Sequence, residues 1–343
     1  MSSVDLSFSR EDRVYHPSES VEGTIVVNAA APIIHSGISL SVSGGVMVQL
    51  FGKGVGVLEV LSGGGSKSVP LFERKVELSH PGKLTEGKSE IQFKIHLGPL
   101  TGPGRPANAS SAPSSSAGGG FTAPTLLPTY HGVYVNIQYL ITVEIRRSFL
   151  QRTLSCVSEF IVEGKRELVL VPRPLSAAEP IKFIITPDTH NHPLGPALRA
   201  AGGFRISGSL ASICSVDEPL IGDLTVEKSS LPIKSIEVQL MRVESVPLHD
   251  KTLREVSAVQ TTEVAVGDVC RRMMLPIYVI LPRLTVCPMI VTQAFAIEFE
   301  VNVVVTFDLT KLKPTMMLHS KGKHPQNSAA AIKETLPLRV VAA

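Results

Sequence analysis

The stretch from Tyr130 to Arg147, YHGVYVNIQYLITVEIRR, alternates apolar and polar side chains over a greater length than any other part of the chain. Side chains two residues apart lie on the same face of a β-strand. One face of this stretch would carry Val133, Val135, Ile137, Tyr139, Ile141, Val143 and Ile145. Each such side chain contributes roughly 1.5 to 3 kcal/mol when fully buried. The pattern therefore predicts a long, half-buried antiparallel strand on which other strands pack.

The second half of the chain repeats the pattern of the first. The spacing Glu19-x-Val21-x-Gly23-x-Ile25-x-Val27 recurs as Glu218-x-Leu220-x-Gly222-x-Leu224-x-Val226. Four further matches follow the same order: 4–8 with 204–210, 38–42 with 236–240, 91–100 with 275–284, and 130–147 with 295–305. Chance alternation explains one match but not a shared order. The repeat predicts an all-β fold of two tandem β-sandwich domains.

We expect the boundary between the domains within residues 187–203, where Pro, Gly and small residues interrupt the strands. The first domain would then cover 1–190, including a strand at Ile181–Thr186, and the second would cover 191–343. Residues 98–129, with Arg105 as their only charge, predict a flexible insertion in the first domain. Residues 311–334 form a Lys-rich insertion in the second. A solvated loop is the first interpretation of this insertion, and weak contact with anionic lipid or an acidic partner is the alternative.

Composition excludes several classes of protein. The 343 residues suit two domains, and the 43% hydrophobic content with a formal charge of +3 excludes a disordered chain and a strongly basic nucleic-acid binder. The start lacks the apolar core of a secretory signal. The most apolar window, 275–291, contains three prolines and is too short to span a bilayer, so any membrane contact is expected to be indirect. Four widely spaced cysteines predict buried, reduced thiols in a cytosolic protein.

The sequence carries no recognisable reactive centre. Gly52–Val57 resembles a phosphate loop, but it lacks the third glycine and the strand-to-helix context. His190 and His192 could offer two imidazoles to a metal, but no third ligand accompanies them. We therefore expect a protein that is not an enzyme and that holds no cofactor and no metal. A sandwich-fold hydrolase or carbohydrate binder is the weaker alternative.

Two tandem sandwiches without a catalytic motif resemble the arrestin fold. More narrowly, the chain is similar to the arrestin-like vacuolar protein sorting subunit twenty-six family, and within it to the branch found in the retriever, or Commander, complex. The matching segments are Val55–Glu59, Pro81–Lys83, Thr129–Tyr139, Glu159–Val162, Thr186–Pro187, Gly267–Arg271, Pro276–Tyr278, Pro282–Leu284 and Phe299–Val304. The two insertions depart from the family pattern, as does Val266, where the family pattern has an acidic residue.

The resemblance implies a non-enzymatic subunit of an endosomal recycling complex, cytoplasmic and peripheral on endosomes. Its second sandwich would dock on an α-solenoid scaffold, and a metallophosphoesterase-like subunit would join through that scaffold. A sorting-nexin adaptor would bring the membrane cargo. The alternative function is a free-standing arrestin-like adaptor that binds receptor tails directly.

The resemblance also implies a scaffold-binding loop. Carried onto this chain, the loop consists of Val264, Ala265, Val266, Gly267, Asp268, Val269 and Arg271. Small apolar side chains can be buried against a partner, and Gly267 permits close backbone approach. Asp268 and Arg271 would add charge complementarity. From the residues alone, an ordinary hairpin loop is the alternative.

Overall fold

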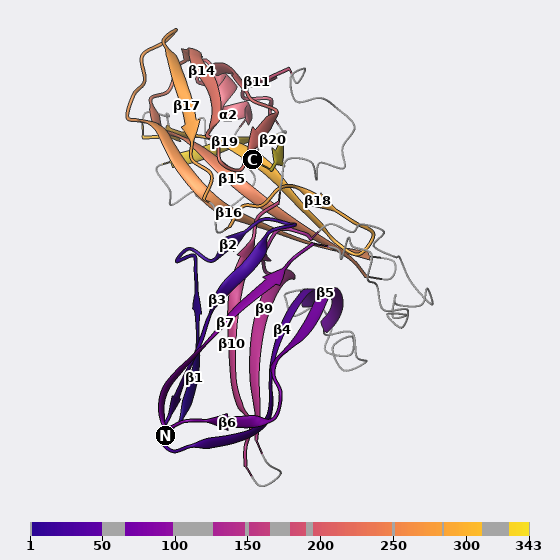
Figure 1. The fold of residues 1–343 in the computed structure, drawn as a ribbon. Helices are drawn as coiled ribbons and strands as arrows, with labels where there is room; N and C mark the ends of the chain where they lie inside the picture. Colours follow the sequence, from indigo (N-terminus) through magenta and orange to yellow (C-terminus); the bar gives the residue numbers. More distant parts are fainter. Residues whose placement is uncertain are drawn as a thin grey trace. The chain divides into compact units, whose positions relative to one another are not determined.

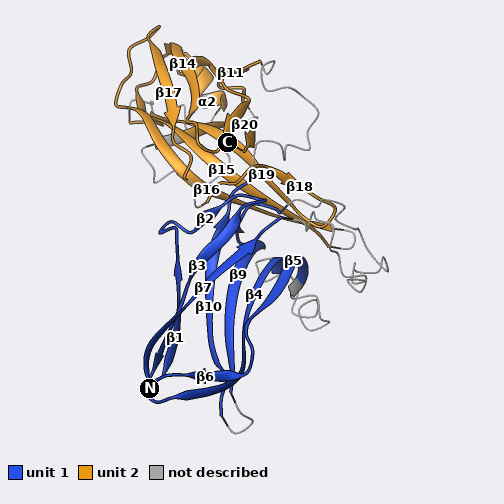
Figure 2. Ribbon diagram, viewed as in Figure 1, with its two compact units in different colours: residues 1–168 blue, residues 169–343 orange. Residues whose placement is uncertain are grey.

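The computed structural model describes residues 2–49, 66–98, 126–147, 151–164, 179–189, 195–248, 251–282, 285–310 and 329–342. The chain divides into two compact units, residues 1–168 and 169–343 (Figure 2). Almost all of the regular structure within the described residues is β-strand (Figure 1). Each unit contains a smaller and a larger sheet. This confirms the prediction of an all-β protein.

The first unit has three strands in its smaller sheet and seven in its larger sheet, counted over the described residues. The smaller sheet consists, in spatial order, of β1 (Ser3–Phe8), β3 (Ser20–Ala29) and β7 (Gly87–His96). The larger consists of β2 (Val14–Tyr15), β10 (Leu154–Val162), β9 (Val135–Arg147), β4 (Ile33–Gln49) and β5 (Ser66–Ser79), with β6 (Gly82–Leu84) paired to β4 and β8 (Tyr130–His131) to β9. Its neighbours are antiparallel except for β2, which runs parallel to β10.

The second unit has four strands in its smaller sheet and six in its larger one, again within the described ranges. The smaller sheet consists of β11 (Ile181–Ile185), β12 (Phe204–Leu210), β14 (Leu220–Ser229) and β17 (Met274–Val279). The larger consists of β13 (Ile213–Ser215), β20 (Ala329–Val341), β19 (Ala296–Asp308), β15 (Ile233–Leu248) and β16 (Lys251–Val266), with β18 (Ile290–Val291) paired to β19. A short helix, α2 (Gly195–Ala200), precedes β12. Six residues are too few to display a helical period, so the sequence did not reveal this helix.

The two units share one topology, which confirms the duplication. Strands β1, β3 and β7 of the first unit correspond to β12, β14 and β17 of the second. The order β2-β10-β9-β4-β5 recurs as β13-β20-β19-β15-β16. Even the parallel pair recurs, because β13 runs parallel to β20 as β2 does to β10. The paired sheets of each unit form the expected tandem β-sandwiches.

The organising strand is β9, and its inner face forms the core of the first unit. Every second side chain from Val135 to Ile145 is fully buried, and those between them are half-buried. Val133 precedes the strand and is 42% exposed, so the prediction that it joins the buried face is wrong. The counterpart strand β19 repeats the alternation, and the rings of Phe204 and Phe307 join the two sheets of the second unit at 4.5 Å between centroids.

The strand at Ile181–Ile185 belongs to the second unit and not, as the sequence suggested, to the first. It pairs antiparallel with β12, and the Phe183 ring lies over Gly208, where a side chain would collide with it. The compact units therefore divide at 168/169 instead of 190/191. The sequence predicts the strand itself, but its partner is set by long-range pairing that no local pattern encodes.

The four cysteines are free thiols, but only two of them are buried. Cys214 and Cys287 lie in the core of the second unit, Cys156 is half-buried, and Cys270 is exposed. Burial raises the pKa of the Cys214 thiol to about 11, with smaller contributions from Glu218 and Asp217. Burial also raises the pKa of Cys287. The expectation that all four thiols are buried is therefore wrong for Cys270.

We expect Cys270 to react with iodoacetamide at neutral pH at least about a hundredfold faster than Cys214 or Cys287, because alkylation needs an accessible thiolate. Peptide mass spectrometry over a time course measures the rates residue by residue. Adding urea should equalise them by exposing the core. Equal rates in the folded protein would contradict the burial described above.

Candidate docking surface on the second unit

The connection between β16 and β17, residues 267–273, is held against the second unit at both ends. Gly267 has a left-handed backbone (φ +80°), and its N–H donates to the carbonyl of Lys234 at 2.8 Å. Arg272 is also left-handed (φ 61°), and its N–H donates to the carbonyl of Val226 at 2.8 Å. Glycine adopts this conformation at no steric cost. The loop is therefore preorganised by backbone hydrogen bonds.

The two charges of the predicted site, Asp268 and Arg271, have partners within the chain. Arg271 Nη2 lies 3.0 Å from Asp268 Oδ1, and the Arg271 guanidinium also donates to the carbonyl of Val269. A longer bond of 3.4 Å joins Arg271 Nη2 to the carbonyl of Ser229. The backbone N–H of Ile233 donates to Asp268 Oδ1 at 3.5 Å. The two side chains thus brace the loop against the connection between β14 and β15, a role that the sequence did not suggest.

The apolar residues of the predicted site differ in exposure. Val264 and Ala265, at the end of β16, are half-buried, as is Val269. Val266, the last residue of β16, is 67% exposed. Val266 therefore has the most exposed apolar side chain of the predicted site, and it lies directly before the fixed backbone of Gly267. Val266 is also the residue at which the sequence departs from the acidic family pattern.

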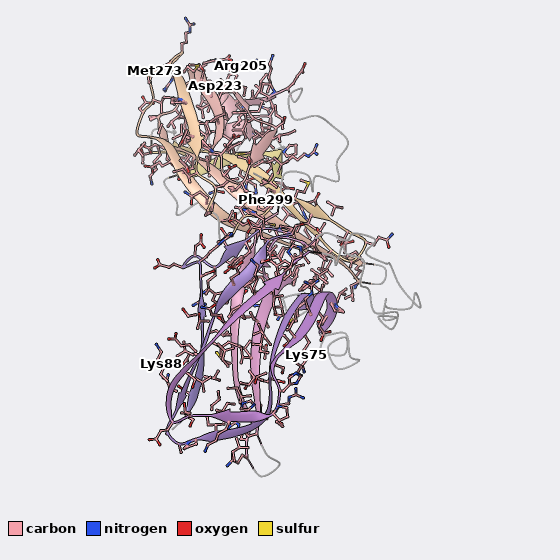
Figure 3. The ribbon with its side chains drawn as sticks, viewed as in Figure 1. Lys75, Lys88, Arg205, Asp223, Met273 and Phe299 are labelled. Carbon is pink, nitrogen blue, oxygen red and sulfur yellow. The ribbon has the colours of Figure 1, made fainter. Side chains whose placement is uncertain are left out.

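The sequence interpretation missed the exposed apolar side chains that follow the loop. Met273, labelled in Figure 3, is the last residue before β17 and Met274 is its first residue, and both side chains are exposed. Tyr278 and Ile280 are exposed further along. A signal was available, because MMLPIYVIL at 273–281 is an unbroken apolar run where alternation would be typical of a half-buried strand.

This surface carries no metal-binding cluster among the residues that the structure describes. Within the described ranges, no group of three or more His, Cys, Asp or Glu side chains is placed to hold a metal ion. Gly52–Val57, His190 and His192 lie outside the described residues. The same part of the chain contains no helix of the length and hydrophobicity needed to cross a membrane.

The tandem β-sandwiches define an arrestin-like fold. The family model described as "Vacuolar protein sorting-associated protein 26" matches residues 124–308. A relative from Dictyostelium discoideum, "Vacuolar protein sorting-associated protein 26C", is 34% identical over 310 residues, which cover 89% of this chain and 94% of the relative. The chain therefore belongs to the Vps26 family, whose members serve protein transport in retromer-like endosomal recycling. This confirms the resemblance drawn from the sequence, including the retriever-associated branch.

Proposed function

We propose that the chain is a non-enzymatic subunit of a retriever-type endosomal recycling complex and that its second unit docks on an α-solenoid scaffold. In this arrangement a metallophosphoesterase-like subunit joins through the scaffold, and a sorting-nexin adaptor supplies membrane cargo. The complex would act at the cytoplasmic face of endosomes. Membership of the Vps26 family and the similarity to a 26C relative support the proposal.

The observation that carries the docking step is the exposure of Val266 on a backbone that hydrogen bonds already hold. Its side chain is 67% exposed, and the next residue is tied to Lys234. A preorganised loop loses little conformational entropy on binding, so more of the contact energy appears as affinity. Asp268 and Arg271 serve the interface indirectly here, because they hold the loop in shape.

Replacing Val266 and Val269 with aspartate should weaken binding to the purified scaffold subunit at least about thirtyfold, since burial of two carboxylates opposes an apolar contact. Size-exclusion co-elution and titration calorimetry measure the effect. The matched control is Ile34→Asp in the first unit, because Ile34 is 68% exposed, close to the value for Val266. Undiminished binding by the double variant would exclude the loop. Binding of receptor-tail peptides by the chain without scaffold would instead favour a free-standing adaptor.

A further inference from the structure

Strand β17 is apolar on both of its faces. Its inner side chains, Leu275, Ile277 and Val279, are buried in the second unit. Its outer side chains, Met274 and Tyr278, are 67% and 58% exposed, and Ile280, directly after the strand, is 66% exposed. A strand with a continuous apolar run is typical of a sheet that is covered on both sides. Among the described residues, the strand pairs only with β14 and lies at the edge of its sheet.

The duplicated fold provides an internal reference for this strand. The counterpart of β17 in the first unit is β7, which buries Phe93 and Ile95 on the same inner face. The outer face of β7 is polar and exposed throughout. It carries Glu90, Gln92, Lys94 and His96. The fold therefore does not require an apolar outer face at this strand.

The difference between the outer faces of β7 and β17 includes one pair of residues that lie opposite each other on neighbouring strands. In the first unit, Glu22 of β3 lies opposite Lys94 of β7, and their side chains form an ion pair at 2.6 Å. In the second unit the corresponding pair is Ile221 of β14 opposite Tyr278 of β17. Ile221 is 57% exposed. The first unit thus has an ion pair where the second has an exposed apolar pair, and exposed apolar patches are typical of interaction surfaces.

Pro276 favours a partner that packs on the face of the sheet over one that extends it by a strand. Pro276 lies in the middle of β17 and has no backbone N–H. Proline within a sheet is confined to edge strands, with its nitrogen on the open side, so β17 is a poor template for an added strand. In layered folds an apolar sheet face is covered by helices or by a second sheet, and the scaffold of the proposed function is helical. Methionine side chains, as at Met274, adapt readily to such a neighbour.

We propose that the outer face of β14 and β17, formed by Ile221, Met274, Tyr278 and Ile280, is covered by an α-helix of the solenoid scaffold. The inference rests on the proposed function and extends it, because it assigns a second contact region. Met273 and Met274 connect this face directly to the β16–β17 loop, so a scaffold that binds the loop also reaches the sheet. The expected helix presents an apolar stripe to β17 and leaves its polar side to solvent.

The test gives the second unit the charged residues that the first unit carries at the corresponding positions of its smaller sheet. The double variant Ile221→Glu, Tyr278→Lys restores the ion pair that the fold accommodates between Glu22 and Lys94. We expect an unchanged circular dichroism spectrum and binding to the purified scaffold that is at least about thirtyfold weaker. The control, Glu22→Lys with Lys94→Glu, alters charge at the equivalent place and should bind normally. Ile280→Ser, just outside the strand, provides a second variant should the double variant fail to fold, and we expect it to weaken binding about tenfold.

The outcomes separate this inference from the proposed function. If the unmodified chain fails to bind the scaffold, the proposed function fails, and this inference fails with it. If the loop variant loses binding while Ile221→Glu, Tyr278→Lys and Ile280→Ser bind normally, the function stands and the helix-covered face is overturned. If the unmodified chain self-associates and these variants abolish only that association, a second copy covers the face and the proposal is wrong.

Discussion

Replacing Val301 with aspartate should lower the free energy of unfolding of the second unit by about 4 kcal/mol or more. Val301 lies in the middle of β19, is fully buried, and pairs across the sheet with Leu240 and Leu336. Described neighbours on this face of the strand, such as Phe299 and Val303, are apolar. A carboxylate there would lose its hydration without gaining a partner, so the substitution combines a lost contact with a desolvation penalty.

Urea denaturation of the full chain measures this effect, and hydrogen exchange of the β15 and β19 amides assigns it to the second unit. The penalty should grow with pH above about 4, because burial raises the pKa of the new carboxyl group above its unfolded value near 3.9. At low pH the new carboxyl group is protonated in both states and the penalty is smallest. The free energy of unfolding then falls as pH rises from the unfolded pKa through the raised pKa of the folded state. The matched control is Val304→Asp on the opposite, half-buried face, beside Lys333. We expect it to cost about 1 kcal/mol or less, and equal losses would show that the inner face is assigned wrongly.

Truncating Glu244 should cost about 3 to 5 kcal/mol, because it would leave Arg242 charged in the core. Arg242 Nε lies 3.3 Å from Glu244 Oε1, and their side chains are only 10% and 1% exposed. The register of β15 on β19 places them opposite the buried residues Phe299 and Ile297, on the core face. Urea denaturation of Glu244→Ala measures the loss.

The first unit suggests the control for this pair. Strand β4 carries Gly44 and Val46 six and eight residues after Ile38, and β15 carries Arg242 and Glu244 six and eight residues after Ile236. The same architecture therefore exists without the charges. The double variant Arg242→Met, Glu244→Leu removes both charges together and should regain most of the lost stability. A double variant as unstable as Glu244→Ala would mean that packing, and not the loss of the ion pair, sets the cost.

Two features of the candidate site could be predicted from the sequence, and two could not. The position of the loop follows from the family resemblance, and the apolar character of Val266 follows from the sequence itself. The mutual pairing of Asp268 with Arg271 does not, because the sequence equally allows both side chains to face a partner. The exposed face at Ile221 and Tyr278 also required the structure, since the two residues are far apart in the chain and meet only through strand pairing.

The sequence by itself determined which side chains face inward along β9 and β19 and that the second half of the chain repeats the first. Both can be read from the order of residues, because side chains alternate between the two faces of a strand and because a duplicated order of strands repeats the same apolar spacing. The tertiary structure alone decided that Ile181–Ile185 joins the second unit, that Arg242 and Glu244 share its core, and that the outer face of β17 is apolar where that of β7 is charged. Each of these depends on which distant strand lies alongside, and that choice is made by the pairing and packing of the whole unit.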